Sequence, residues 1–258
     1  MIMYKYGIDI GSRYTKLCLL GADSRNIIWL GSCLTDVSPL KSASALYHQM
    51  LDESGVSEAQ VSASCATGYG RHLFKLSTAT LSEISCHAAG VRLHYPEAAT
   101  VIDIGGQDSK IISITPEGKI GDFVMNDKCA AGTGRFLEMT AIRLGVEIND
   151  LSQIASSANQ SLVLSSTCVV FAESEIIGMM AANTSREDIA HAVHLSIARR
   201  IHSQMAGLKA TDPIVFTGGL ARSQDLINCL SMILETKVLS CPYPEYSGAI
   251  GAALLAEA

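Results

Sequence analysis

A ten-residue motif occurs twice in the chain and sets the strongest limit on its fold. Residues 7–16 read GIDIGSRYTK and residues 101–110 read VIDIGGQDSK, with the Ile, Asp, Ile, Gly and Lys identical. In each copy an apolar run precedes the glycine turn, and a second strand-like run follows it. This pattern predicts a β-hairpin with small residues in its turn. Two copies predict a duplicated fold in which each half contains one such hairpin.

The chemistry of the two turns indicates binding of a nucleoside triphosphate. Glycine turns present backbone N–H groups to an anion, and an Asp at a strand end can hold Mg²⁺ or orient an attacking water. A third glycine loop, FTGGLARS at 216–223, has the strand, glycine, helix order of a nucleotide-binding turn. One glycine hairpin alone is more often structural, so the prediction rests on the three loops together.

The remaining pattern predicts two α/β halves with no low-complexity linker between them. After the first hairpin we expect a strand at 26–31, a helix at 42–54 and a strand that leads into the segment ATGYG. We expect a further strand at 213–217 and helices at about 81–94, 133–144, 149–157, 170–182, 186–209, 222–235 and 246–257.

The long helix at 186–209 has the clearest local signals. Ser185 with Asp188 three residues later resembles a capping box. Apolar residues then recur every four positions and predict one buried stripe: Ile189, Val193, Ile197, Ile201 and Met205. Three histidines fall roughly on one face, where a solvated polar face is favoured over metal ligation: His191, His194 and His202.

Charge and apolar patterning predict a cytoplasmic protein that binds neither nucleic acid nor a membrane. The net charge is −6, and no basic run interrupts it. The N-terminus lacks the apolar core of a signal peptide, and the most apolar stretch contains Glu173 and Glu175. In the cytoplasm the eight cysteines should be reduced thiols or metal ligands.

Two of the eight cysteines stand apart from the rest. Cys129 and Cys168 lie in polar, glycine-rich or Ser/Thr-rich loops, which makes them candidates for metal ligation, although a small buried side chain is the alternative. Cys129 also precedes a helix predicted to begin near Gly132, and a helix N-terminus stabilises a thiolate. The other six are expected to be small buried side chains: Cys18, Cys33, Cys65, Cys86, Cys229 and Cys241.

Five segments carry a resemblance to a known family: GIDIGSRYTK, ATGYGRH, VIDIGGQDSK, NDKCAAGTGRFLE with SSTCVVFAESE, and FTGGLARS. Together they resemble the BadF/BadG ATPases of the actin, sugar-kinase and Hsp70 superfamily. Within that family they are most similar to the activators of 2-hydroxyacyl-CoA dehydratases, over about residues 4–256. The resemblance implies an α/β fold of two RNase-H-like subdomains around a nucleotide cleft. The first would span 1–98, completed by a C-terminal helix at 244–258, and the second 99–243.

The same resemblance implies the cofactors and partners. It implies a cytoplasmic homodimer that binds ATP or ADP with Mg²⁺ and shares one [4Fe–4S] cluster, whose ligands would be Cys129 and Cys168 of each chain. Two thiolates from each of two chains supply the four that such a cluster usually needs. ATP binding and hydrolysis would drive one electron from a ferredoxin or flavodoxin to a partner dehydratase or reductase.

Within these segments we assign provisional roles. The first phosphate loop would comprise Asp9, Gly11, Ser12 and Lys16. The second would comprise Asp103, Gly105, Gly106 and Gln107. Asp9 would lie on the Mg²⁺ side, while Asp103 and Gln107 would position the attacking water. A simple turn residue is the alternative for Gln107.

Two further glycine loops complete the expected site. One would approach the nucleotide from the second subdomain, and the other would lie beneath the adenosine. The first contains Gly132, Thr133 and Gly134, and the second contains Gly218 and Gly219. Because Cys129 shares a segment with the Gly-Thr-Gly turn, closure on ATP is expected to move the cluster ligand as well. Arg13 and Tyr14 stand where the family more often has small or hydroxyl residues; they would touch phosphate or point outward.

Two other functions compete with this one. A small-molecule kinase of the same superfamily could use Asp103 as its base, but it leaves Cys129 and Cys168 unexplained, and 258 residues leave little room for a substrate domain. A non-catalytic assembly protein or scaffold would bind partners or form filaments without iron.

Overall fold

The computed structural model describes residues 3–23, 25–166 and 168–257. The chain forms two compact units. The first unit consists of Met1–Glu97 and Cys241–Ala258, and the second unit is Ala98–Ser240. Each unit contains one five-stranded mixed sheet with helices packed on it, which confirms the predicted α/β class.

The sheet of the first unit is built around the first predicted hairpin. Its strands are β1 (Tyr4–Ile10), β2 (Tyr14–Gly21), β3 (Ile27–Leu34), β4 (Val61–Thr67) and β5 (Ala79–Thr80), in the order β3-β2-β1-β4-β5. β1 pairs antiparallel with β2 and parallel with β4, and Asp9 lies opposite Lys16. Most residues of β1 and β2 are buried because both faces of the sheet are covered.

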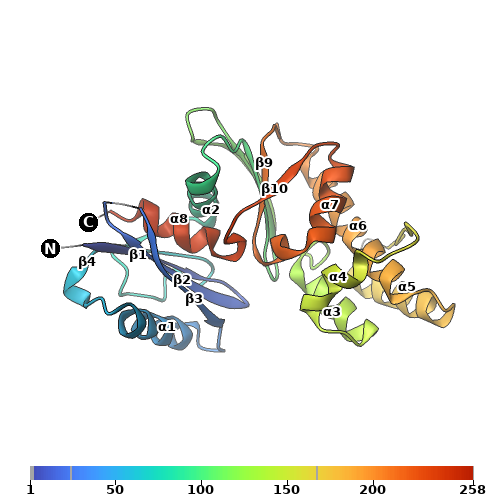
Figure 1. Ribbon diagram of the computed structural model, residues 1–258, viewed down its shortest axis with the longest axis horizontal. Helices are drawn as coiled ribbons and strands as arrows, with labels where there is room; N and C mark the ends of the chain where they lie inside the picture. The colour runs from blue at the N-terminus through green and yellow to red at the C-terminus, as the bar shows by residue number, and fades with distance from the viewer. Residues whose placement is uncertain (1–2, 24, 167, 258) are drawn as a thin grey trace. The chain divides into compact units, whose positions relative to one another are not determined.

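Three helices cover that sheet. They are α1 (Pro39–Ser54), α2 (Glu83–His94) and α8 (Ser247–Leu255). α1 packs on one face, α8 packs on the other, and α2 lies against α8 (Figure 1). The approach of α8 is close because Gly7 of β1 presents no side chain to it: a Cβ there would overlap the backbone of Ala249.

The sheet of the second unit repeats the first in topology. Its strands are β6 (Thr100–Ile104), β7 (Ser109–Ile114), β8 (Ile120–Asn126), β9 (Ile214–Thr217) and β10 (Val238–Ser240), in the order β10-β9-β6-β7-β8. Read from the other edge, this order matches the first sheet strand for strand. Asp103 lies opposite Lys110, as Asp9 lies opposite Lys16. The duplication that the repeated motif predicts is therefore confirmed.

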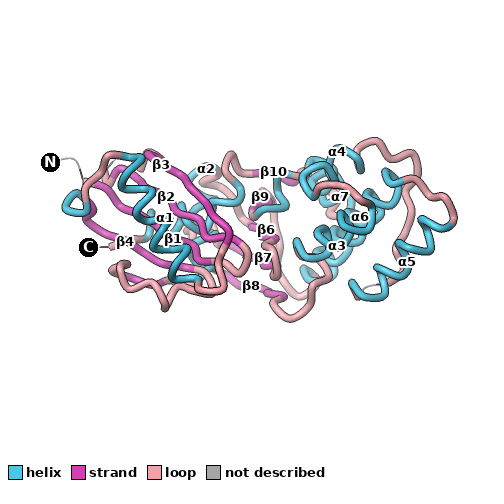
Figure 2. Tube along the Cα trace, turned by 90° about the horizontal axis from the view of Figure 1, so that it is seen from below, coloured by secondary structure: helices cyan, strands magenta, loops and turns pink. Residues whose placement is uncertain are grey.

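The helices of the second unit form its core together with the sheet. They are α3 (Gly134–Leu144), α4 (Leu151–Ala155), α5 (Val169–Ala181), α6 (Arg186–Met205) and α7 (Gln224–Ile233). They gather on one side of the second sheet (Figure 2). The helices predicted in this region are present with shifted ends. The largest shift is at the end of α6, which stops at Met205 although the prediction extended it to residue 209. A 3₁₀ turn over Gly219–Arg222 precedes α7.

α6 confirms its predicted start and its buried stripe, but not the prediction for its histidines. Ser185 accepts a hydrogen bond from the Asp188 N–H, and all five stripe residues are buried. His194 is only 1% exposed, and His191 is half-buried. A solvated polar face is therefore the wrong description of these two residues, because α7 packs over them and places Asp225 against both. His202 is exposed as expected.

The thiols outside the two polar loops are mostly buried, as predicted. Burial is found for Cys18, Cys65, Cys86, Cys229 and Cys241, whereas Cys33 is only half-buried. Among the described residues, no helix combines the length and the apolar character needed to cross a membrane.

Candidate functional site

The first glycine turn holds a carboxylate at the end of β1. Asp9 is buried, and Lys16 Nζ lies 3.5 Å from its Oδ2. The turn is closed by the Gly11 N–H, which donates to the Tyr14 carbonyl at 3.1 Å. The two residues between them, Ser12 and Arg13, have exposed side chains, as does Tyr14. A buried acid beside an open turn is an arrangement suited to a cation and phosphate.

The second glycine turn has the same plan with a tighter ion-pair network. Asp103 is 2% exposed, and Lys110 Nζ lies 3.1 Å from its Oδ2 and 2.7 Å from Asp108 Oδ2. The Gly105 N–H donates to the Asp108 carbonyl at 2.9 Å. Gln107 projects to the surface, where its amide is accessible. Buried Lys110 therefore fixes the orientation of the Asp103 carboxylate.

Asp108 and Lys110 were not assigned to the site from the sequence. The signal for Lys110 was available, because it is the last identical residue of the repeated motif and matches Lys16. Asp108 has no counterpart in the first copy, where Tyr14 occupies the equivalent position. Its contact with Lys110 could not be inferred from the repeat.

A glycine lies against each of the two motif aspartates. Gly218 follows β9 with φ +89°, and a Cβ there would lie 2.7 Å from Asp103 Oδ1. Gly68 follows β4 with φ +87°, and a Cβ there would lie 2.6 Å from Asp9 Oδ1. Only glycine permits this conformation and this approach. Each of these glycines is the second residue of a Thr-Gly pair at the end of a parallel strand. This shared pair was a sequence signal for Gly68, which is not among the predicted site residues. Gly219, by contrast, is open on its side-chain face.

The start of α3 is bonded directly to the second turn. The N–H groups of Gly134 and Arg135 donate to the carbonyls of Gly105 and Gly106, each at 2.9 Å. A Cβ on Gly134 would lie 3.1 Å from the Gly106 Cα, so the glycine permits this approach. Two of the N–H groups at the start of α3, unpaired within the helix, are thereby satisfied by the turn.

The rest of the Gly-Thr-Gly segment is buried behind that contact. Gly132 has φ +79°, and Thr133 is the N-cap residue of α3. The Thr133 hydroxyl donates to the Ala130 carbonyl at 2.8 Å. The predicted residues of the second unit are thus gathered around one turn, and those of the first unit around another.

Cys129 is held by the residue that ends β8. Asn126 Nδ2 donates to the Cys129 carbonyl at 2.8 Å, and the Cys129 N–H donates to Asn126 Oδ1 at 3.1 Å. The same Nδ2 also donates to the Ala131 carbonyl at 3.3 Å. One amide therefore fixes the backbone of the loop that joins Cys129 to α3, and it leaves the thiol half-exposed.

Cys168 is the N-cap residue of α5, and its side chain is exposed. Glu175 of α5 accepts hydrogen bonds from the Ser165 N–H at 2.8 Å and from the Ser166 N–H at 3.1 Å. Burial alone would raise the pKa of Glu175, but the serine donors outweigh it and lower the pKa overall. The carboxylate thus holds the loop that leads into Cys168.

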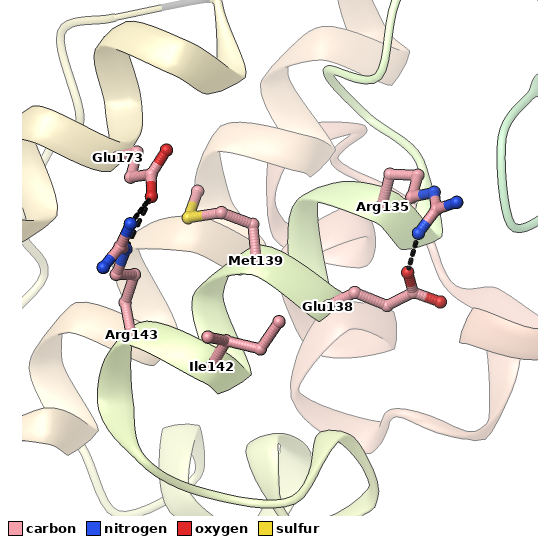
Figure 3. Close-up of a pocket in the computed structure, with 6 residues that line it drawn as sticks. All are labelled: Arg135, Glu138, Met139, Ile142, Arg143 and Glu173. Atoms are coloured by element: carbon pink, nitrogen blue, oxygen red, sulfur yellow. Dashed lines mark hydrogen bonds and ion pairs between the residues drawn. The ribbon is translucent and has the colours of Figure 1, made fainter.

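A pocket of about 300 Å³ lies between α3 and α5 (Figure 3). Arg143 of α3 forms an ion pair with Glu173 of α5, and Arg135 pairs with Glu138 at 2.7 Å. Met139 and Ile142 lie between the two pairs. α3 therefore contacts the second turn at its start and α5 near its end, which connects the two cysteine-bearing segments within one unit.

The donor chemistry of the two loops fits an iron–sulfur cluster. Cys129 and Cys168 are the two thiols that combine a position near a helix start with solvent access. Five of the remaining cysteines are buried inside the two units. Cys129 and Cys168 therefore present accessible thiols outside the apolar cores, as ligands to an iron–sulfur cluster would need to.

Comparison with known proteins agrees with this site. Residues 6–256 match the family described as the BadF/BadG/BcrA/BcrD ATPase family. The chain is 40% identical over 258 residues to the activator of lactoyl-CoA dehydratase from Anaerotignum propionicum, which covers 98% of this chain and 97% of that protein. It is 37% identical to the (R)-2-hydroxyglutaryl-CoA dehydratase activating ATPase from Acidaminococcus fermentans, covering 99% and 98%.

The solved structures give the same result for the fold. The activator of the 2-hydroxyisocaproyl-CoA dehydratase from Clostridium difficile, with bound ADPNP, superposes with a TM-score of 0.93 at 35% identity, covering 98% of this chain and 93% of that chain. A ROK family glucokinase from Streptomyces griseus shares the fold alone, with a TM-score of 0.64 at 13% identity and coverage of 98% and 99%. The predicted superfamily fold and the family resemblance are confirmed.

Proposed function

The chain belongs to the BadF/BadG/BcrA/BcrD ATPase family, and we propose that this ATPase activates a 2-hydroxyacyl-CoA dehydratase or a related reductase by ATP-driven transfer of one electron. The observation that carries the proposal is the bonded path in the second unit, which runs from the Gly105–Gly106 turn through α3 to α5. The family resemblance supports an activating role, because relatives along the full length of the chain are named as dehydratase activators.

The nucleotide is proposed to be ATP, bound with Mg²⁺ and released as ADP. Asp9 acts on the Mg²⁺ side, and Asp103 with Gln107 positions the attacking water. The backbone and polar groups of the turns bind phosphate: Gly11, Ser12, Lys16, Gly105 and Gly106. The start of α3 is hydrogen-bonded to the second turn, so its Gly132, Thr133 and Gly134 affect the nucleotide through that turn. The loop beneath the adenosine contains Gly218 and Gly219. Each unit is proposed to be an RNase-H-like subdomain.

The redox centre is proposed to be one [4Fe–4S] cluster held by Cys129 and Cys168 of two identical chains. When bound, the cluster supplies a carrier for a single low-potential electron. Asn126 fixes the backbone around Cys129, and Glu175 fixes the loop before Cys168. A cytoplasmic location keeps these thiols reduced, and a ferredoxin or flavodoxin is the proposed electron donor.

The surface beside Cys168 supports the homodimer. Val170 and Phe171, in the first turn of α5, are each 68% exposed. Ile142 of α3 is also exposed, next to the pocket between the two helices. Apolar side chains at this position lose unfavourable contact with water when a second copy covers them. The proposed cluster ligand therefore lies at the edge of a surface suited to self-association.

Nucleotide state is proposed to reach the cysteines through α3. A change at the Gly105–Gly106 turn on binding or hydrolysis acts on the two hydrogen bonds that start α3. α3 transmits it to α5 through the Arg143–Glu173 pair. Exposure of the cluster and docking of the partner enzyme would then depend on nucleotide.

The deciding experiment is anaerobic iron and sulfide quantitation with electron paramagnetic resonance. Wild type should contain about four irons per dimer, and Cys129→Ala and Cys168→Ala should each lose them. Cys33→Ala is the matched control, because Cys33 is another partly exposed thiol outside the two loops. A full iron complement in both loop variants would refute the proposal. Identical signals and partner binding with ATP, ADP and no nucleotide would refute the coupling.

A further inference from the structure

We propose that His191, Asp225 and Cys229 form a second metal site, for Zn²⁺ or a similar divalent transition metal, apart from the proposed cluster. His191 comes from α6, whereas Asp225 and Cys229 lie four residues apart on α7 and share one face of that helix. Their donor atoms all lie within 4.8 Å of one another. The site joins the two helices at a point remote in sequence from both polar cysteine loops.

The separations of the donor atoms match a tetrahedral ion. His191 Nδ1 lies 3.1 Å from Asp225 Oδ2, and Cys229 Sγ lies 3.9 Å from His191 Nδ1 and 3.8 Å from the same Oδ2. Usual Zn–ligand lengths in a tetrahedron place N and O about 3.4 Å apart and S about 3.6 Å from either. Shifts of a few tenths of an ångström would therefore bring all three donors to one ion.

A further histidine holds the carboxylate in place. His194 Nδ1 lies 2.7 Å from Asp225 Oδ2, and His194 is buried. Side chains that bind a metal ligand from behind fix its orientation and commonly change affinity by about 10–100-fold when removed. His194 holds the carboxylate through Oδ2, while both carboxylate oxygens lie 3.1 Å from His191 Nδ1. His194 is thus a positioning residue for this site.

Burial makes a bound cation a strong compensating interaction for this cluster. Asp225 and Cys229 are buried against the apolar core of the second unit, and one carboxylate faces two imidazoles and a thiol there. Placing this many polar groups in such surroundings is unfavourable unless strong interactions compensate. The side chain of His191 is 21% exposed, so the site is open to solvent on that side, from which a water would supply the fourth ligand.

The donor set selects the class of metal. One nitrogen, one oxygen and one sulfur suit Zn²⁺, and Co²⁺ can replace it as a spectroscopic probe. On binding, the Cys229 thiol gives up its proton to solvent, and the thiolate forms the metal–sulfur bond. The thiolate and carboxylate together balance the charge of a divalent ion. A metal here would link α6 to α7 and stabilise the second unit.

The test is an anaerobic Co²⁺ titration of the full chain carrying Cys129→Ser and Cys168→Ser, so that the proposed cluster ligands are absent. We expect one Co²⁺ per chain and a thiolate-to-cobalt charge-transfer band. Adding Cys229→Ala should abolish the band, and adding His194→Asn should weaken binding by about 10–100-fold. Cys241→Ala is the control for loss of a buried thiol, and His202→Asn is the control for a histidine of α6.

Thermal denaturation with Zn²⁺ gives an independent readout if Cys229→Ala folds poorly. Zn²⁺ should raise the melting temperature of the parent and of the His202→Asn variant but not that of His191→Asn, whose side chain is partly exposed and tolerant of change. Absence of a saturable band in the parent would overturn the proposal. Equal Co²⁺ binding by the parent and His191→Asn would also overturn it. Since the cluster ligands are absent throughout, either result leaves the electron-transfer proposal to its own test.

Discussion

Replacing Gly218 with alanine should strongly destabilise the second unit. Gly218 has φ +89° and ψ 174°, a region confined almost entirely to glycine and costing another residue about 1–3 kcal/mol. The added Cβ would lie 2.7 Å from Asp103 Oδ1 and 2.8 Å from the Ile104 carbonyl carbon, and it would overlap the Ile104 oxygen. Moving that backbone costs about 1–3 kcal/mol more. The expected loss is therefore about 2–6 kcal/mol in the free energy of unfolding.

Calorimetry on anaerobic protein measures this loss, and the neighbouring glycine provides the control. A change of this size should lower the melting temperature by at least about 4 °C. Gly219→Ala adds the same methyl group one residue later, where nothing lies within 4 Å of the new Cβ. Its unfolding free energy should stay within about 0.5 kcal/mol of wild type.

The duplication extends the prediction to the first unit. Gly68 has φ +87°, and its Cβ would lie 2.5 Å from the Ile10 oxygen and 2.6 Å from Asp9 Oδ1. Gly68→Ala should therefore destabilise the first unit by a similar amount. If G218A and G219A unfold with the same free energy, the close approach to Asp103 is not a constraint and the reasoning is wrong.

Three further predictions concern single side chains. Lys110→Met should lower the free energy of unfolding in urea by about 3–5 kcal/mol, because it leaves two buried carboxylates without their shared cation. The control Lys16→Met removes one partly exposed ion pair and should lower it by less than about 1 kcal/mol. The serine donors keep the pKa of Glu175 low although burial raises it, so its stabilising effect is complete above about pH 4.3 and is lost as pH falls through the folded pKa. Hydrogen exchange of its loop, corrected for intrinsic rates, should accelerate there in wild type but not in Glu175→Gln. Asn126→Ala should keep its circular dichroism but bind less iron than wild type after identical reconstitution, because the Cys129 loop loses its hydrogen bonds.

The elements that could be predicted from the sequence are those with local causes. Each motif hairpin depends on apolar runs and a glycine turn that are adjacent in the chain. Ser185 accepts a hydrogen bond from the N–H of Asp188, which is only three residues away. Short edge strands were not foreseen. β5 and β10 contain two and three residues, and they form because β4 and β9 offer a free edge to them.

The polar face of α6 shows why other features lay beyond the sequence. His191 and His194 have the spacing of a surface face, and only the packing of α7 turns it inward. Asp225 comes from a segment more than thirty residues away. No local pattern predicts which helix will cover another. The same limit applies to Asp108, whose contact with Lys110 depends on how the second turn folds back.

The duplication also accounts for the position of Cys129, in the loop that joins β8 to α3. In the first unit, Thr35 follows β3 and its Oγ1 donates to the Gly11 carbonyl at 2.9 Å. In the second unit, the chain after β8 bonds the matching carbonyl of Gly105 through the Gly134 N–H. Both units therefore hold the motif glycine from the segment that follows the third strand. Backbone N–H groups alone attach α3 to the turn, so this contact does not need a thiol. Cys129 lies in the segment that the duplicated fold attaches to the turn in this way. A movement of the turn is therefore expected to move Cys129, the proposed cluster ligand, with it.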